Sequence, residues 1–124
     1  MEFKTDYHIH SFYSDGVLSP TEIVKRFRAL DYDIISITDH DGFEGLREAR
    51  DAVKDLEMEV VPGIEFSTLY DFDGEKLELH ILGYNFDTED KNMIRTCEEL
   101  KENRKERNSK LIAKLKAEGI DISL

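Results

Sequence analysis

The stretch DIISITDHD, residues 33–41, decides the fold that this sequence predicts. Its first six residues are largely apolar and rich in isoleucine, which is typical of a strand buried on both faces in a parallel sheet. The run ends in Thr38-Asp39-His40-Asp41, a density of polar side chains that is unusual for a structural loop. Because α/β proteins place their active sites beyond the carboxyl ends of their strands, the stretch indicates an α/β fold with a functional edge.

The segments around this stretch alternate between strand and helix patterns. Residues 4–9 alternate polar and apolar side chains as a strand does, and Ser19-Pro20-Thr21-Glu22 is a capping box that opens a helix. A second helix is expected over residues 43–56 and a third strand over residues 59–62. The order strand, helix, strand, helix, strand predicts an α/β architecture.

A hairpin is expected after these elements. Residues 66–72 and 76–84 flank Asp73-Gly74, a turn signal that predicts an antiparallel pair of strands. A length of 124 residues suits one core but not a complete eight-stranded β/α barrel, which needs about 200 residues or more. The chain, residues 1–124, is therefore expected to form a single domain.

A long helix is expected to follow the hairpin. Thr88 is predicted to cap it, and Gly119 to stop it just after Glu118. The polar block at residues 101–110 is either a solvated helix face or a kink between two helices. Residues 120–124 are expected to begin a further element.

The composition indicates an acidic, water-soluble protein, with 17 basic and 28 acidic residues and a formal net charge of −11. Such a surface repels duplex nucleic acid and anionic lipid, so an anionic substrate requires a local positive source, either a metal or a basic patch. Cys97 is the single cysteine, which excludes an intramolecular disulfide and favours a reducing compartment. Neither a signal peptide nor a membrane-spanning run is recognised, so a cytoplasmic location without membrane association is expected.

The chain contains four histidines, His8, His10, His40 and His80, each at or near the carboxyl end of a predicted strand. His8 and His10 are two residues apart on a strand, so both imidazoles point to the same side. They either bind metal there or are polar residues on a solvent face. By itself, His80 is typical of a hydrogen-bonded core histidine.

Four carboxylates are candidate partners of these histidines or of the second helix. Asp15 occupies a turn, and Asp41 is predicted to cap the second helix. Asp39 is expected either to orient the His40 ring or to serve as a ligand itself. Glu65 follows the third predicted strand, where a buried carboxylate is costly unless it is paired or bound to a cation, so it is a bridging-ligand candidate. Mixed nitrogen and oxygen ligands suit zinc, manganese or iron.

Together these motifs resemble the PHP (polymerase and histidinol phosphatase) domain family over nearly the whole chain. The motifs that carry the resemblance are His8-Ile9-His10-Ser11, Ser14-Asp15-Gly16, Thr38-Asp39-His40-Asp41, Pro62-Gly63-Ile64-Glu65 and His80-Ile81-Leu82-Gly83. The resemblance implies the N-terminal part of a distorted (β/α)7 barrel, with an added antiparallel hairpin and a long C-terminal helix. It also implies two or three divalent metal ions and phosphoester hydrolysis by a metal-activated water.

The resemblance implies metal ligation by His8, His10, Asp15, His40, Glu65 and His80. The most similar subgroup is that of stand-alone phosphoesterases acting on small nucleotides or short oligonucleotides. Arg104 and Arg107 lie three residues apart on one helix face, where they either clamp a substrate phosphate or remain solvated.

One departure from the family pattern limits this interpretation. The family supplies a further histidine and an Asp-x-His pair late in its chain, whereas no histidine follows His80 here. The chain is therefore expected to be truncated before the late ligands, which leaves the activity of these residues alone open. A non-catalytic metal-binding or assembly module and purely structural histidines are the alternatives. Uncovered barrel edges predict self-association.

Overall fold

The computed structural model of the chain describes residues 2–123. The chain forms two compact units, one that ends at Thr88 and one that begins at Glu89. The elements are, in order, β1 (Thr5–Ile9), α1 (Pro20–Ala29), β2 (Ile34–Ile37), α2 (Leu46–Val53), β3 (Glu59–Val60), β4 (Gly63–Phe72), β5 (Glu75–Tyr84) and α3 (Lys91–Ala117).

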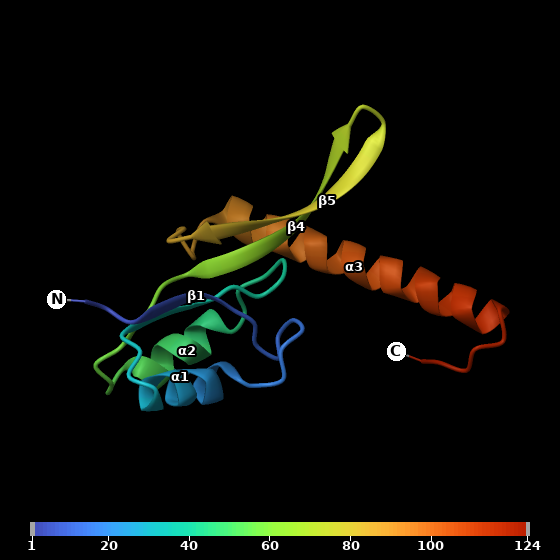
Figure 1. Cartoon of the computed structure of the whole chain (residues 1–124). Helices are drawn as coiled ribbons and strands as arrows, with labels where there is room; N and C mark the ends of the chain where they lie inside the picture. The colour runs from blue at the N-terminus through green and yellow to red at the C-terminus, as the bar shows by residue number, and fades with distance from the viewer. Residues whose placement is uncertain (1, 124) are drawn as a thin grey trace. The chain divides into compact units, whose positions relative to one another are not determined.

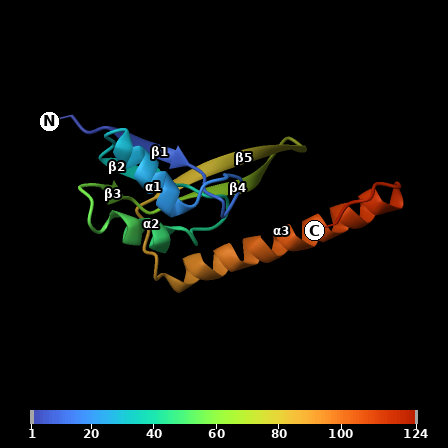
Figure 2. The same ribbon diagram turned by 90° about the horizontal axis from the view of Figure 1, so that it is seen from below.

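The first unit contains a three-stranded parallel sheet in the order β1-β2-β3. Helices α1 and α2 cover one face of this sheet (Figure 1, Figure 2). Side chains from both layers form the buried core, which consists of Ile23, Val24, Ile35, Ile37, Leu46, Ala49 and Val60. The α/β class predicted from the sequence is confirmed, whereas the expected partial seven-stranded barrel stays a prediction.

Helix α1 begins where the sequence predicts it. The Ser19 hydroxyl accepts a hydrogen bond from the Glu22 amide, and the Glu22 carboxylate accepts one from the Ser19 amide. These reciprocal bonds satisfy two backbone donors that the first turn would otherwise leave unpaired. The start of the helix is thereby fixed, and Ile23 and Val24 are buried against the sheet.

Two predicted elements are shorter in the structure. Helix α2 covers Leu46–Val53 rather than residues 43–56, because Asp41 adopts a left-handed φ of 57° and the chain turns before the helix can begin. Strand β3 pairs with β2 only through Glu59 and Val60. It ends before Pro62, which has no backbone donor to continue the ladder.

Strands β4 and β5 form the expected antiparallel hairpin, with ten residues in each strand. Its turn residues, Asp73 and Gly74, have φ angles of 50° and 82°. Positive φ at both central positions is the signature of a type I′ turn, which matches the twist of the flanking strands. The hairpin begins at Gly63, earlier than the sequence pattern predicts.

Gly63 permits a close approach between β4 and β2. A Cβ atom at this position would overlap the hydroxyl of Ser36 and would lie 2.8 Å from the Thr38 methyl group. Ser36 and Thr38 are both fully buried. The missing side chain therefore lets β4 pass beside the carboxyl end of β2, which brings Glu65 next to His40.

The second unit contains helix α3, which runs unbroken through the polar block at residues 101–110. The solvated-face interpretation of this block is therefore confirmed, and the kinked one is wrong. Asp90 caps the helix by accepting a hydrogen bond from the Met93 amide at 2.8 Å, so the prediction that Thr88 caps it is wrong. Residues 120–123 form no helix or strand, and residue 124 lies outside the described residues.

Candidate metal centre

The backbone of β4 places Glu65 beside His40. The Glu65 amide donates to the Asp39 carbonyl at 3.0 Å, and the Asp41 amide donates to the Glu65 carbonyl at 2.9 Å. These bonds form a parallel bridge between His40 and Glu65 beyond the end of β2. The predicted position of Glu65 at the end of the third strand is wrong, because Glu65 is near the start of β4.

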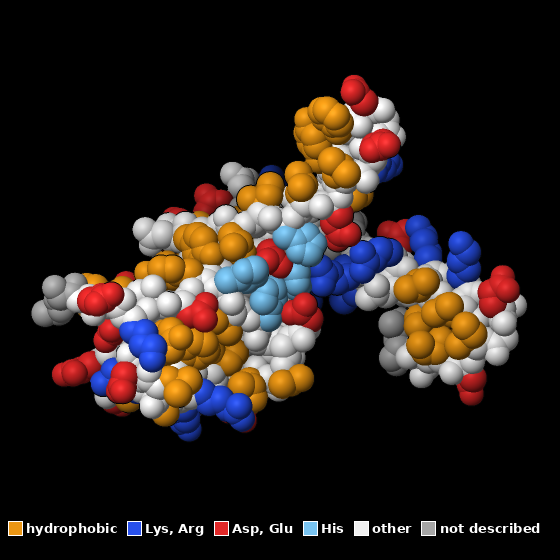
Figure 3. Space-filling view, viewed as in Figure 1, with side chains coloured by type: hydrophobic (Ala, Val, Ile, Leu, Met, Phe, Trp, Pro, Cys, Tyr) orange, Lys and Arg blue, Asp and Glu red, His pale blue; other side chains and the backbone are white. Residues whose placement is uncertain are grey.

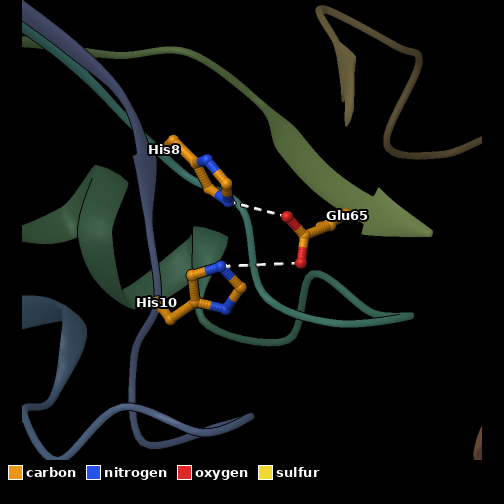
Figure 4. A group of neighbouring side chains, drawn as sticks. All are labelled: His8, His10 and Glu65. Carbon is orange, nitrogen blue, oxygen red and sulfur yellow. Dashed lines mark ion pairs between the residues drawn. The ribbon is translucent and has the colours of Figure 1, made fainter. Parts of the chain in front are cut away.

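Glu65 faces the imidazoles of all four histidines. Its side chain is 6% exposed, and its Oε1 atom lies 2.7 Å from His8 Nε2. The Oε2 atom lies 3.0 Å from His40 Nδ1, 3.3 Å from His80 Nδ1 and 3.7 Å from His10 Nε2. Figure 4 shows the His8 and His10 rings both pointing at the Glu65 carboxylate. The strand alternation inferred for this pair is confirmed.

Asp15 joins the same cluster from the loop after β1. Its Oδ1 atom lies 2.9 Å from His10 Nδ1, and its Oδ2 atom lies 3.2 Å from His40 Nε2. Partial burial by itself would raise the pKa of Asp15, but the charges of His10 and His40 and the hydrogen bond to His40 lower the pKa. Asp15 therefore favours its ionised form, which is the form that ligates a cation.

His80 lies within β5, opposite Ser67, and not at a strand end as predicted. Its side chain is 41% exposed, so the interpretation as a core histidine is wrong. Its Nε2 atom lies 3.2 Å from Glu78 Oε1. The Glu78 hydrogen bond raises the pKa of His80, burial opposes this shift, and the charge of Glu65 adds to it. Sequence reasoning missed Glu78, although its i, i+2 spacing to His80 on one strand face was visible.

The donor set forms three overlapping groups whose ligand atoms lie within 4.8 Å of one another. The groups are His8, His10 and Glu65; His10, Asp15 and His40; and His40, Glu65 and His80. His40 Nδ1 is buried and has no hydrogen-bond partner among the described residues, although Glu65 is near it. A buried ring nitrogen without a hydrogen-bond partner, lying among other nitrogen and oxygen ligand atoms, fits a divalent cation. Figure 3 shows the histidines gathered on one face, with acidic side chains among them.

Asp39 does not orient the His40 ring, contrary to the sequence-based expectation. Its carboxylate is 2% exposed and accepts hydrogen bonds from the Ser11 amide, the Ser11 hydroxyl and the Ser14 hydroxyl. No hydrogen bond or ion pair joins Asp39 to the His40 ring in the described part of the chain. Adjacent residues of an extended segment point to opposite sides, so the two side chains diverge.

Asp41 is not the cap of α2. Gly45 occupies the N-cap position and makes no side-chain hydrogen bond. The Asp41 Oδ1 atom instead accepts the Ser67 amide at 2.8 Å. This contact ties the turn after β2 to β4 and supports the placement of Glu65 two residues earlier.

A family model of the PHP domain matches residues 6–121. The chain belongs to the PHP domain family. The resemblance found in the sequence motifs is thereby confirmed over nearly the whole chain.

Named relatives of this PHP chain include two hydrolases. The chain is 38% identical, over 97% of its length, to a 5'-3' exoribonuclease of Haemophilus influenzae, of which it covers 42%. It is 33% identical, over 93% of its length, to a 3',5'-nucleoside bisphosphate phosphatase of Chromobacterium violaceum, of which it covers 39%. The chain therefore spans about two fifths of the length of these relatives.

A solved structure shares the fold of this PHP chain. An amidohydrolase from Chromobacterium violaceum, with bound sulfate and no metal, matches with a TM-score of 0.84 and 32% identity. The match covers 96% of this chain and 40% of that one.

The two arginines that were predicted to bind phosphate, Arg104 and Arg107, both lie on α3 of this PHP chain, in the second unit. Their phosphate role stays a prediction.

Among the described residues, none of the helices combines the length and apolar character required to cross a membrane.

Proposed function

We propose that this chain is part of a PHP-type metal-dependent phosphoesterase that hydrolyses phosphate esters of small nucleotides or short oligonucleotides. The observation that carries the proposal is the meeting of all four histidines at one buried carboxylate, Glu65. A buried charge surrounded by imidazoles is costly without a compensating cation. The named functions of the two relatives support the choice of phosphate esters.

Two or three divalent ions, of zinc, manganese or iron, are the cofactors that this donor set fits. Glu65 would bridge, with His8 and His10 at one side and His40 and His80 at the other. A neutral imidazole has one nitrogen lone pair and can ligate one ion through it. His10 is shared with the group of His8 and Glu65, and His40 is shared with the group of Glu65 and His80, so each ring can serve only one of its two groups. Asp15 would be a further ligand in the group that it forms with His10 and His40.

Charge explains how an acidic protein would accept an anionic substrate. Asp15 and Glu65 together bring two negative charges to the cluster. Two or three divalent ions reverse this to a local charge of about +2 to +4. When bound, such ions activate water for attack and neutralise charge on the phosphate. The histidines and carboxylates of the cluster would hold the ions, and Arg104 and Arg107 are proposed to bind a substrate phosphate.

The proposed substrates are small because the rest of the surface disfavours long polyanions. A net charge of −11 repels duplex nucleic acid at long range, whereas a short nucleotide needs only the local positive field. The cytoplasm, where nucleotides and their short fragments occur, is the proposed location.

Metal analysis of the purified chain tests the proposal first. We expect two or three bound divalent ions, and we expect the double variant His8→Ala with His10→Ala to lower the metal content to background. Glu65→Gln removes the bridging charge and should have the same effect. Glu75→Gln is the matched control, because Glu75 is exposed and opposite Phe72 at the far end of the hairpin.

Hydrolysis assays then separate an enzyme from a metal-binding module. With manganese present, the chain should release phosphate from a generic phosphomonoester and from a nucleoside 3',5'-bisphosphate. Metal binding without hydrolysis would contradict an active enzyme for this chain and support the non-catalytic module. Failure to bind metal would leave the histidines with a structural role.

A further inference from the structure

The loop after β1 is held by a buried carboxylate that the proposed chemistry does not use. Asp39 Oδ1 accepts the Ser11 amide and the Ser14 hydroxyl, both at 2.7 Å, and Oδ2 accepts the Ser11 hydroxyl at 2.5 Å. All three donors are neutral. Ser11 and Ser14 both lie in the loop segment between His10 and Asp15. Their hydrogen bonds to Asp39 therefore fix the conformation of that loop.

Proton accounting at Ser14 gives this arrangement a chemical consequence. The Ser14 hydroxyl lies 2.7 Å from Asp39 Oδ1, 3.4 Å from Asp15 Oδ1 and 3.4 Å from His10 Nδ1. A hydroxyl has a single proton, and the shortest contact to an anionic acceptor takes it. The oxygen lone pairs of Ser14 are then left to accept a hydrogen bond from His10.

We infer that Asp39 and Ser14 form a positioning pair that holds His10 in one tautomer. In this tautomer Nδ1 carries the proton and donates a hydrogen bond to the Ser14 hydroxyl oxygen, and Nε2 presents its lone pair to the side of Glu65. The pair therefore assigns His10 to the ion shared with His8 and Glu65, rather than to the group of Asp15 and His40. The inference deepens the proposed metal-dependent function and rests on it for its purpose.

Asp15 can also accept the hydrogen bond from His10 Nδ1, but only while it does not ligate an ion. Its Oδ1 atom also faces His10 Nδ1, at the shorter distance of 2.9 Å, but its side chain is 65% exposed. Once Asp15 turns to a cation, Ser14 is the remaining acceptor at Nδ1. Partners that orient a ligating histidine in this way typically change metal affinity by about 10- to 100-fold.

The test removes Asp15 so that Ser14 acts alone. Long-range ¹⁵N NMR of the metal-free chain, at a pH about two units above the ordinary histidine pKa of about 6.5, distinguishes the two His10 tautomers directly. We expect Asp15→Ala to retain the Nδ1–H tautomer and the double variant with Ser14→Ala to lose it. The double variant with Ser14→Thr, which keeps the hydroxyl, should retain it.

A matched control separates this effect from loosening of the loop. Ser11→Ala also removes a hydrogen bond to Asp39, but the Ser11 hydroxyl makes no hydrogen bond to the His10 ring among the described residues, so the tautomer should be unchanged in the Asp15→Ala background. Loss of the Nδ1–H form in Asp15→Ala alone would overturn the inference. Its persistence after Ser14→Ala would overturn it as well.

Metal affinity provides a second readout in the chain that retains Asp15. Titration calorimetry with Mn²⁺ should give about tenfold weaker binding for Ser14→Ala than for Ser14→Thr. Equal affinities would contradict the positioning role. If no variant binds metal, the proposed function fails, whereas the NMR result on metal-free protein still decides the His10 tautomer.

Discussion

Protons and metal ions compete for the same nitrogen atoms in this cluster. Glu65 is a buried anion that either protonated histidines or divalent cations can compensate, and only neutral imidazoles can ligate a metal. His80 is the ring whose pKa is raised, chiefly by the hydrogen bond to Glu78. The exposed carboxylate of Glu78 therefore influences how readily a proton leaves His80 when a cation arrives.

Glu78→Gln should lower the pKa of His80. The amide keeps the shape of the side chain but removes the charge and the strong acceptor at 3.2 Å from Nε2. Since the folded-state pKa is raised above 6.5, the contact stabilises the fold below that value. The contribution is lost as the pH rises through the folded-state pKa. An NMR titration of His80 in metal-free protein measures the shift, and Glu75→Gln should leave it unchanged; equal shifts in both variants would contradict the assignment to Glu78.

At the scale of elements, the start of α3 shows how backbone donors decide between two capping residues that the sequence offers. Both Thr88 and Asp90 are residue types that cap helices. The Asp90 side chain reaches the Met93 amide, whereas Thr88 lies in the turn before it. A capping side chain bonds the amide two or three residues further along the chain, and Asp90 does so at Met93. Asp90, the later of the two candidates, is therefore the N-cap of α3.

Asp90→Ala should destabilise the start of α3 by about 1 kcal/mol, the usual cost of losing a side-chain cap. Thr88→Ala should change the stability of the helix by less than about 0.5 kcal/mol, as surface substitutions do. Carbon chemical shifts of residues 91–94 and the helical circular dichroism signal report the fraying. A larger effect from Thr88→Ala than from Asp90→Ala would show that the sequence-based cap was right.

The close approach of β4 to β2 depends on a single glycine. Gly63→Ala would place a methyl group against the buried Ser36 and Thr38 side chains, with an overpacking cost of about 1–3 kcal/mol. Denaturant unfolding should show this loss. Metal affinity should fall with it, because Glu65 is two residues further along the same strand.

Gly83→Ala, on the neighbouring strand β5, is the control for Gly63→Ala. A Cβ at Gly83 would lie 3.4 Å from the Ile64 side chain, which is ordinary van der Waals contact. Its unfolding midpoint should stay close to that of the unaltered chain. If Gly63→Ala were as stable as Gly83→Ala, β4 and β2 could move apart without loss of folding free energy, which would contradict the prediction.

The elements and the site differ in how far the sequence alone predicts them. Helix α1 and the Asp73-Gly74 turn were predicted because their signals lie within a few residues. The convergence of the histidines on Glu65 was predicted from strand ends and the family motifs. The partners of Asp39 and Asp41 were not, because Ser11 and Ser67 are more than 25 residues away and only the packed sheet brings them near.

At the scale of the whole molecule, the hairpin exposes an unusual amount of apolar surface. Residues at alternate positions of β4 and β5 share one face, the opposite one to Glu65 and His80. Its side chains are between 44% and 57% exposed, and they are Tyr70, Phe72, Leu77, Leu79 and Ile81. A contiguous apolar face on a two-stranded sheet with open edges favours association with another copy of the chain.

Self-association of the chain should therefore rise with concentration and depend on this apolar hairpin face. Light scattering after size-exclusion chromatography should give an average mass above that of a monomer, and Leu79→Lys should return it to the monomer value. Val17→Lys makes an equally drastic change at a side chain that is 89% exposed outside the hairpin, and it should leave association intact. A clean monomer at every concentration would contradict the prediction. Equal effects of the two lysines would point instead to general charge repulsion, because each adds the same positive charge to a protein of net charge −11.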